Sequence, residues 1–145
     1  MIENFVNNNE IYAIIIRSNF KSEGIKFFTP NNFSQQLGYM CHEADHIIEP
    51  HFHNLVTREV KLTNEVLFIK SGKVRIDFYD NNQKYLESSI LNKGDVILLS
   101  NGGHGFKILE KTEMIEVKQG PYVGDKDKTR FNSNLIDKIK FNKDE

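Results

Sequence analysis

The stretch Glu65-Val-Leu-Phe-Ile-Lys-Ser-Gly72-Lys-Val-Arg-Ile-Asp-Phe-Tyr-Asp80 decides the fold of this 145-residue chain. Its first part is an apolar run, and its second part alternates apolar with polar side chains. Alternation with a period of two is typical of a strand with one buried and one solvated face. A glycine between two such runs is typical of a tight turn. The stretch therefore predicts a β-hairpin with strands over 65–70 and 73–80.

The flanking sequence repeats this pattern of short apolar runs separated by turn signals. Asn81-Asn82, for example, predicts a turn, because asparagine tolerates left-handed backbone angles. Further strands are predicted over 11–17, 25–28, 37–41, 83–91, 96–99, 106–109 and 114–117. Short strands between closely spaced turns indicate a β-sandwich or barrel. Beyond them, apolar spacing over 134–139 predicts a short amphipathic C-terminal helix.

Length and composition place the chain in an ordinary globular class. We expect one domain over 1–145, with a barrel core over about 11–120 and a tail over 125–145. A net charge of -1 gives no electrostatic reason to expect nucleic acid or an acidic membrane as partner. Cys41 is the only cysteine, so no internal disulfide forms, and the N-terminus lacks a signal-peptide pattern. We therefore expect a cytoplasmic protein.

Three histidines lie on either side of the hairpin, and a glutamate begins it. His51 and His53 are one residue apart, so on a strand both side chains point to the same face. Glu65 opens the next apolar run, and His104 lies in the glycine-rich stretch 100–106. Three imidazole nitrogens and one carboxylate oxygen make a ligand set for a divalent transition metal. We expect these four side chains to converge on such a metal.

The chain contains two stretches that resemble the two motifs of the cupin superfamily. Cupins begin with HxH, followed by a glutamate, six residues and a glycine, and His51-x-His53, Glu65 and Gly72 stand in that order. The spacing departs from the family, because the eleven residues of 54–64 separate the second histidine from the glutamate, more than cupins usually have. This departure bears on whether Glu65 reaches the metal.

The second cupin motif is a glycine, a short strand, Pro-x-Gly and a histidine. Gly94, the apolar run 96–99 and Ser100-Asn-Gly-Gly-His104 follow that order, with Ser100 in place of the proline. Ile108 stands where the family has an asparagine. The resemblance covers about residues 35–120, and it supports the fold more strongly than the ligand set.

The resemblance implies the fold class, the cofactor and the assembly. The fold would be a double-stranded β-helix, the cupin jelly-roll barrel, in a protein that is often a homodimer. His51, His53, Glu65 and His104 would bind iron, manganese, nickel or zinc inside the mouth of the barrel. The stretch 124–131 is also similar to the tail of sugar-nucleotide ketoisomerases of this superfamily, which points to carbohydrate biosynthesis.

Glu59 and Tyr39 are the candidate catalytic residues. Glu59 lies at the centre of the polar insert 54–64, where it is a candidate base and a rival to Glu65 for the oxygen ligand. Tyr39, Arg58 and Tyr79 are candidates for contacting a substrate. Each has an alternative interpretation as a surface or packing residue.

Three classes of function follow from these residues and stay open at this point. The first is a metal-dependent enzyme that isomerises, epimerises or oxygenates a small polar substrate. The second is a metal-free sugar-nucleotide isomerase in which His51 or His53 is the base. The third is a non-catalytic protein that binds a small ligand.

Overall fold

The computed structural model describes residues 1–133 and 139–141, and these residues form an all-β protein. The predicted C-terminal helix over 134–139 lies almost entirely outside the described residues. A single 3-10 turn, η1, spans Gly124–Lys126. The strands are β1 (Ile2–Asn7), β2 (Glu10–Ile16), β3 (Gly24–Phe27), β4 (Gly38–Cys41), β5 (Glu65–Ser71), β6 (Lys73–Tyr79), β7 (Tyr85–Asn92), β8 (Val96–Leu99), β9 (Gly103–Ile108) and β10 (Glu113–Lys118).

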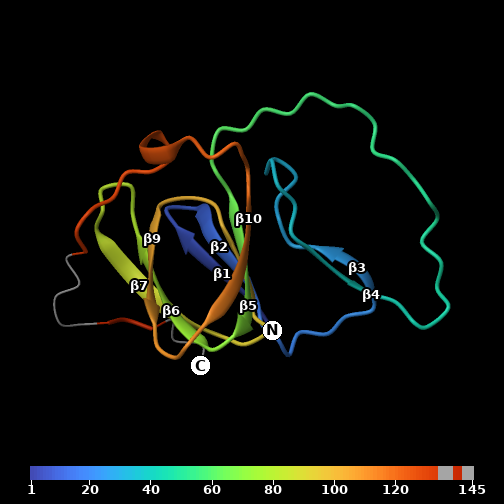
Figure 1. The fold of residues 1–145 in the computed structure, drawn as a ribbon, viewed down its shortest axis with the longest axis horizontal. Coiled ribbons are helices and arrows are strands. Elements are labelled where there is room, and N and C mark those ends of the chain that lie inside the picture. The colour runs from blue at the N-terminus through green and yellow to red at the C-terminus, as the bar shows by residue number, and fades with distance from the viewer. Residues whose placement is uncertain (134–138, 142–145) are drawn as a thin grey trace.

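The strands form three antiparallel sheets that do not close into a barrel. The largest sheet has the order β1-β2-β8-β5-β10, and a three-stranded sheet has the order β7-β6-β9. The third sheet is the β3–β4 hairpin. In Figure 1 the two larger sheets face each other, while the hairpin lies to one side. The expected all-β class is confirmed, and the cupin jelly-roll barrel is not.

The hydrophobic core lies between the two larger sheets, because alternate residues of their strands point inward. In β6 these are Val74, Ile76 and Phe78, which are at most 2% exposed. Burial of one such side chain contributes about 1.5–3 kcal/mol. The other buried members are Ala13 and Ile15 of β2, Leu67 and Ile69 of β5, Leu91 of β7, and Ile97 and Leu99 of β8.

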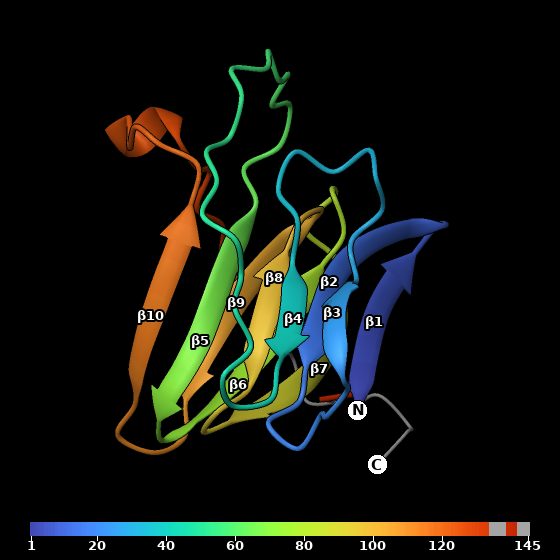
Figure 2. The ribbon, with the colours of Figure 1, turned by 90° about the vertical axis from the view of Figure 1, so that its right-hand side faces the viewer.

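A second apolar cluster covers the outer face of the five-stranded sheet. Ile14 and Ile16 of β2 and Leu98 of β8 point outward, and Leu37 packs against them from the segment that leads into β4. Figure 2 shows β3 and β4 in front of β2 and β8. The segments that flank β3 and β4 are therefore held to the body by apolar contacts, while Ile25, Phe27 and Met40 of the two strands are exposed.

A buried ion pair joins the N-terminal strands to the body. Arg17 follows β2, and its Nη1 lies 2.9 Å from Asp95 Oδ2, while its Nη2 donates to Glu3 Oε2 at 2.7 Å. Burial acts to lower the pKa of Arg17, but the hydrogen bonds and charges of both carboxylates outweigh it and raise that pKa. The guanidinium therefore stays charged and satisfies Asp95, which is 2% exposed.

The segment 42–63, which we call the arm, is the main departure from expectation. All its residues are exposed and none lies in a strand, so the prediction that His51 and His53 lie on a strand is wrong. Figure 1 shows the chain between β4 and β5 arching away from the body. A strand exists only where its backbone pairs with a neighbour, and the arm lies beside no sheet edge. Pro50 has no N–H, so at that residue the arm can pair only as an edge strand.

Candidate functional site

Glu65 and His104 come together at one end of the facing sheets. Glu65 begins β5 and shares the inward face of Leu67, while His104 lies opposite the inward residue Phe78. Glu65 Oε2 is 3.1 Å from His104 Nε2. The side chains are 15% and 29% exposed, so the pair is half-buried but reachable from solvent. The structure thus unites two of the four expected ligands.

Cationic groups surround this pair. Lys118 of β10 lies opposite Glu65 in register, and its Nζ is 3.6 Å from Glu65 Oε1. The hydrogen bond from His104 lowers the pKa of Glu65; burial acts in the opposite direction, and the charges of Lys118 and Lys128 reinforce the lowering. The carboxylate therefore holds its negative charge at neutral pH.

A pocket of about 630 Å³ opens at the Glu65–His104 pair. The segment after η1 forms one wall with Lys128, Arg130 and Phe131. Tyr79 lines another part of it, and its hydroxyl donates to Ser133 Oγ at 3.0 Å. The pocket therefore combines the contacting carboxylate and imidazole, two basic side chains, a further carboxylate of Glu116 and aromatic surface.

Gly102 sets the course of the backbone into His104. Its φ of +67° lies in the left-handed region that favours glycine, and a Cβ there would collide with the ring of Tyr12. The glycine-rich stretch therefore brings the start of β9 close to β2.

His51 and His53 lie outside this pocket. Both are exposed on the arm, where their rings are 5.4 Å apart and His51 Nδ1 lies 2.9 Å from the carbonyl oxygen of Glu49. Within residues 1–133 and 139–141, no group of three or more His, Cys, Asp or Glu side chains is placed to hold a metal ion. In this arrangement the four expected ligands do not fit a metal centre, and their ligand role stays a prediction.

The two candidate catalytic residues also lie away from the Glu65–His104 pocket. Glu59 is 77% exposed on the arm and pairs with Lys61 at 3.5 Å. Tyr39 belongs to β4, where its ring meets Phe20 edge-on at 5.1 Å. Tyr79, considered only for substrate contact, does line the pocket.

Sequence reasoning missed the cationic side chains of the site. Lys118 ends an apolar strand, and only the register of β10 against β5 places it opposite Glu65. Lys128 and Arg130 belong to a mixed-sign run that is typical of a solvated surface. The one available signal is that this run lies in the stretch 124–131, for which the sequence alone suggests a role.

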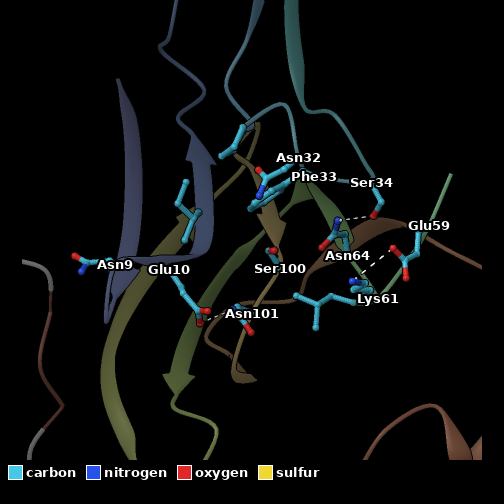
Figure 3. A pocket seen from close by; sticks show the side chains of 13 residues that line it. Asn9, Glu10, Asn32, Phe33, Ser34, Glu59, Lys61, Asn64, Ser100 and Asn101 are labelled. Atoms are coloured by element: carbon cyan, nitrogen blue, oxygen red, sulfur yellow. Dashed lines mark hydrogen bonds and ion pairs between the residues drawn. The ribbon is translucent and has the colours of Figure 1, made fainter.

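A second pocket, of about 540 Å³, lies where the arm returns to the body (Figure 3). Asn64, just before β5, is 3% exposed; its backbone N–H donates to Gln119 Oε1 at 2.6 Å, and its Nδ2 donates to Ser34 Oγ at 3.4 Å. Its Oδ1 is buried and has no hydrogen-bond partner within the described part of the chain. Such an orphaned acceptor costs about 1–3 kcal/mol. Asn64 therefore fixes the end of the arm to the body, although its side-chain oxygen lacks a hydrogen bond to any described residue.

Comparison with known proteins identifies no relative. No family model, no curated protein and no solved structure matches this chain. Among the described residues, no helix is long and apolar enough to cross a membrane. The function therefore has to be argued from the geometry.

Proposed function

We propose that the protein transfers a proton on a small, polar, negatively charged substrate that carries a carbonyl group. The observation that carries this proposal is the 3.1 Å contact between Glu65 and His104 at the pocket. A histidine oriented by a carboxylate is a common arrangement for general acid–base catalysis. Here His104 is the proposed catalytic residue and Glu65 the positioning residue.

The two nitrogens of His104 have different surroundings. Nε2 faces Glu65, while Nδ1 makes no hydrogen bond to any residue that the structure describes. In the proposed step, Nδ1 takes a proton from the carbon next to the substrate carbonyl and leaves an enolate. Where that carbon carries a hydroxyl, its O–H proton passes to the former carbonyl oxygen, and His104 returns the abstracted proton to the neighbouring carbon on the same face. The carbonyl thereby moves by one carbon with no net change of electrons, so the outcome is isomerisation.

The basic side chains of the pocket suit a substrate that carries an anionic group. Lys128 and Arg130 line the same pocket as the pair, and Glu116 is a further acidic residue in its lining. Positive side chains hold phosphate or carboxylate groups by charge-assisted hydrogen bonds. Phosphorylated sugars combine such a group with a carbonyl, which agrees with the similarity of the stretch 124–131 to ketoisomerase tails.

Hydrogen exchange tests the proposal without knowledge of the product. The protein is incubated in D2O with a panel of sugar phosphates and free keto-sugars, and loss of the proton beside the carbonyl is followed by NMR. We expect exchange with a phosphorylated member, slowed at least about 100-fold by His104→Gln and by Glu65→Gln. Glu113→Gln is the matched control, because Glu113 is a β10 carboxylate that pairs with Lys70 outside the pocket. Absence of exchange, or equal exchange in all variants, would contradict the proposal.

Metal binding is the second candidate function, favoured by the adjacency of one carboxylate and one imidazole, two ligand types that transition metals accept. A full set requires His51 and His53 as well, so it requires the arm to lie elsewhere. Elemental analysis of the protein after incubation with iron, manganese, nickel or zinc tests this candidate. We expect near-stoichiometric metal that is lost in His51→Ala/His53→Ala. Equal metal content in the two proteins would exclude the histidines as ligands.

A further inference from the structure

Two strands at the ends of different sheets each leave one edge open. Within the described residues, β9 pairs only with β6, and β10 pairs only with β5. Residues 109–112 connect the two strands directly, so the open edges adjoin at that end. An open edge carries N–H and C=O groups that can pair with a further strand.

The core itself is uncovered along this side. Phe106 of β9 lies opposite Ile76 of β6, and Ile108 lies opposite Val74, so these residues share the inward face. Ile76 and Val74 are 0% exposed, whereas Phe106 is 37% and Ile108 is 51% exposed. An inward-facing residue is exposed in this way only where a covering element is missing.

The pairing of β10 with β5 also places an exposed residue opposite a buried one. Met114 lies opposite Ile69, which is 0% exposed, and yet Met114 is 36% exposed. The edge strand β1 differs, because its Phe5 packs against the core and stacks on Phe78 with ring centroids 4.3 Å apart. The side between β9 and β10 is therefore short of a strand, and the edge of β1 is not.

The arm carries side chains that suit this position. Ile47 is 74% exposed and Leu55 is fully exposed, and on an extended segment both share a face with His51 and His53. Neither core cluster of the described chain includes these residues. An extended segment with such side chains is the kind that adds to an open sheet edge.

We propose that the arm of one molecule pairs with the free edge of β9 in a second copy of this chain, and that the exchange is reciprocal. The arm as it stands favours a second copy, because both its ends are fixed on its own body. Leu37, just before β4, packs on β2 and β8, and the backbone of Asn64 is held by Gln119. Docking in a second copy moves neither anchor, and a two-fold arrangement gives both copies the same contacts.

Pairing of the arm would complete the histidine set. Side chains alternate along a strand, so a register that turns the partner's His51 and the partner's His53 inward places them on the face of His104. Phe52 then points outward, on the face of Lys107. This assembly of four ligands rests on the metal-binding candidate, whereas the exchange of strands does not.

Disulfide trapping tests the exchange directly. In a background with Cys41→Ala, one variant carries Phe52→Cys and a second carries Lys107→Cys; the two are mixed and oxidised. We expect a disulfide-linked pair of one chain of each kind. A third variant with Asn82→Cys, in the exposed turn before β7, replaces Lys107→Cys as the control and is expected to cross-link at least tenfold less.

Three outcomes would overturn the exchange. The first is equal cross-linking to both positions, and the second is no cross-linking. The third is a disulfide that forms only within single chains of a Phe52→Cys/Lys107→Cys double variant, which would mean that the arm closes on its own body. Light scattering on the unmodified protein supplies the second readout, with a dimer expected. Repeating it with Glu65→Gln separates the proposals, because this variant is expected to lose hydrogen exchange while remaining dimeric.

Discussion

The β3–β4 region and the arm are neighbours in the chain, but only the β3–β4 region packs against the body. The segment that leads into β4 buries Leu37 against the outer face of β2 and β8. The arm, which begins directly after β4, leaves Phe52 and Leu55 in solvent. Both contain large apolar side chains, so apolar content does not separate them. The difference is that Leu37 covers the outer face of the five-stranded sheet, whereas no arm residue belongs to either core cluster.

Hydrogen bonding follows the same division. In the hairpin region, the hydroxyl of Thr29 donates to Gln36 Oε1 at 2.8 Å and accepts the backbone N–H of Leu37 at 3.1 Å. In the arm, the polar side chains make only local contacts, such as the exposed pair of Glu59 and Lys61. Exposed ion pairs contribute little to stability. Among the described residues, the arm is therefore held by few interactions with the rest of the chain.

The largest expected contrast is between two leucine truncations. Leu37→Ala removes a buried side chain and should lower the free energy of unfolding by about 2–5 kcal/mol. Leu55→Ala removes an exposed one and should change it by less than about 0.5 kcal/mol. Urea unfolding of both variants, at a protein concentration where light scattering shows monomer, measures the contrast.

The same pair of variants also tests the exchange of arms. If Leu55→Ala costs as much as Leu37→Ala in the monomer, the arm covers its own body and the contrast between the two segments disappears. If Leu55→Ala is silent in the monomer but costly at high concentration, a second copy covers the arm.

The strands of the body could be predicted from the sequence because each carries its own signal. Alternation and glycine turns are local signals. They predicted each end of β5 and β6 to within one residue. The strand β1 was missed, because Ile2–Asn7 mixes polar and apolar residues without a clear period. A local pattern therefore predicts a strand only when one of its faces is strongly apolar.

The site was predicted only in part, because it depends on which strands become neighbours. Glu65 and His104 were found through motif order, and the structure joins them. Lys118 was missed, since register between β5 and β10 is not readable from either strand alone. His51 and His53 satisfy the spacing rule for a strand, but spacing does not supply the neighbouring edge that makes a strand form.

The smallest expected contrast uses two threonines, one in each region. Thr29→Val keeps the shape of a side chain that is 7% exposed but removes its two hydrogen bonds, which leaves the N–H of Leu37 without its acceptor. We expect a loss of about 1–3 kcal/mol in the free energy of unfolding. Thr57→Val in the exposed arm is the matched control, with an expected change below about 0.5 kcal/mol. Equal losses in urea unfolding of the monomer would show that Thr57 is also hydrogen-bonded in a buried place. The arm would then be a packed part of the body, and the open edge of β9 would need a different partner.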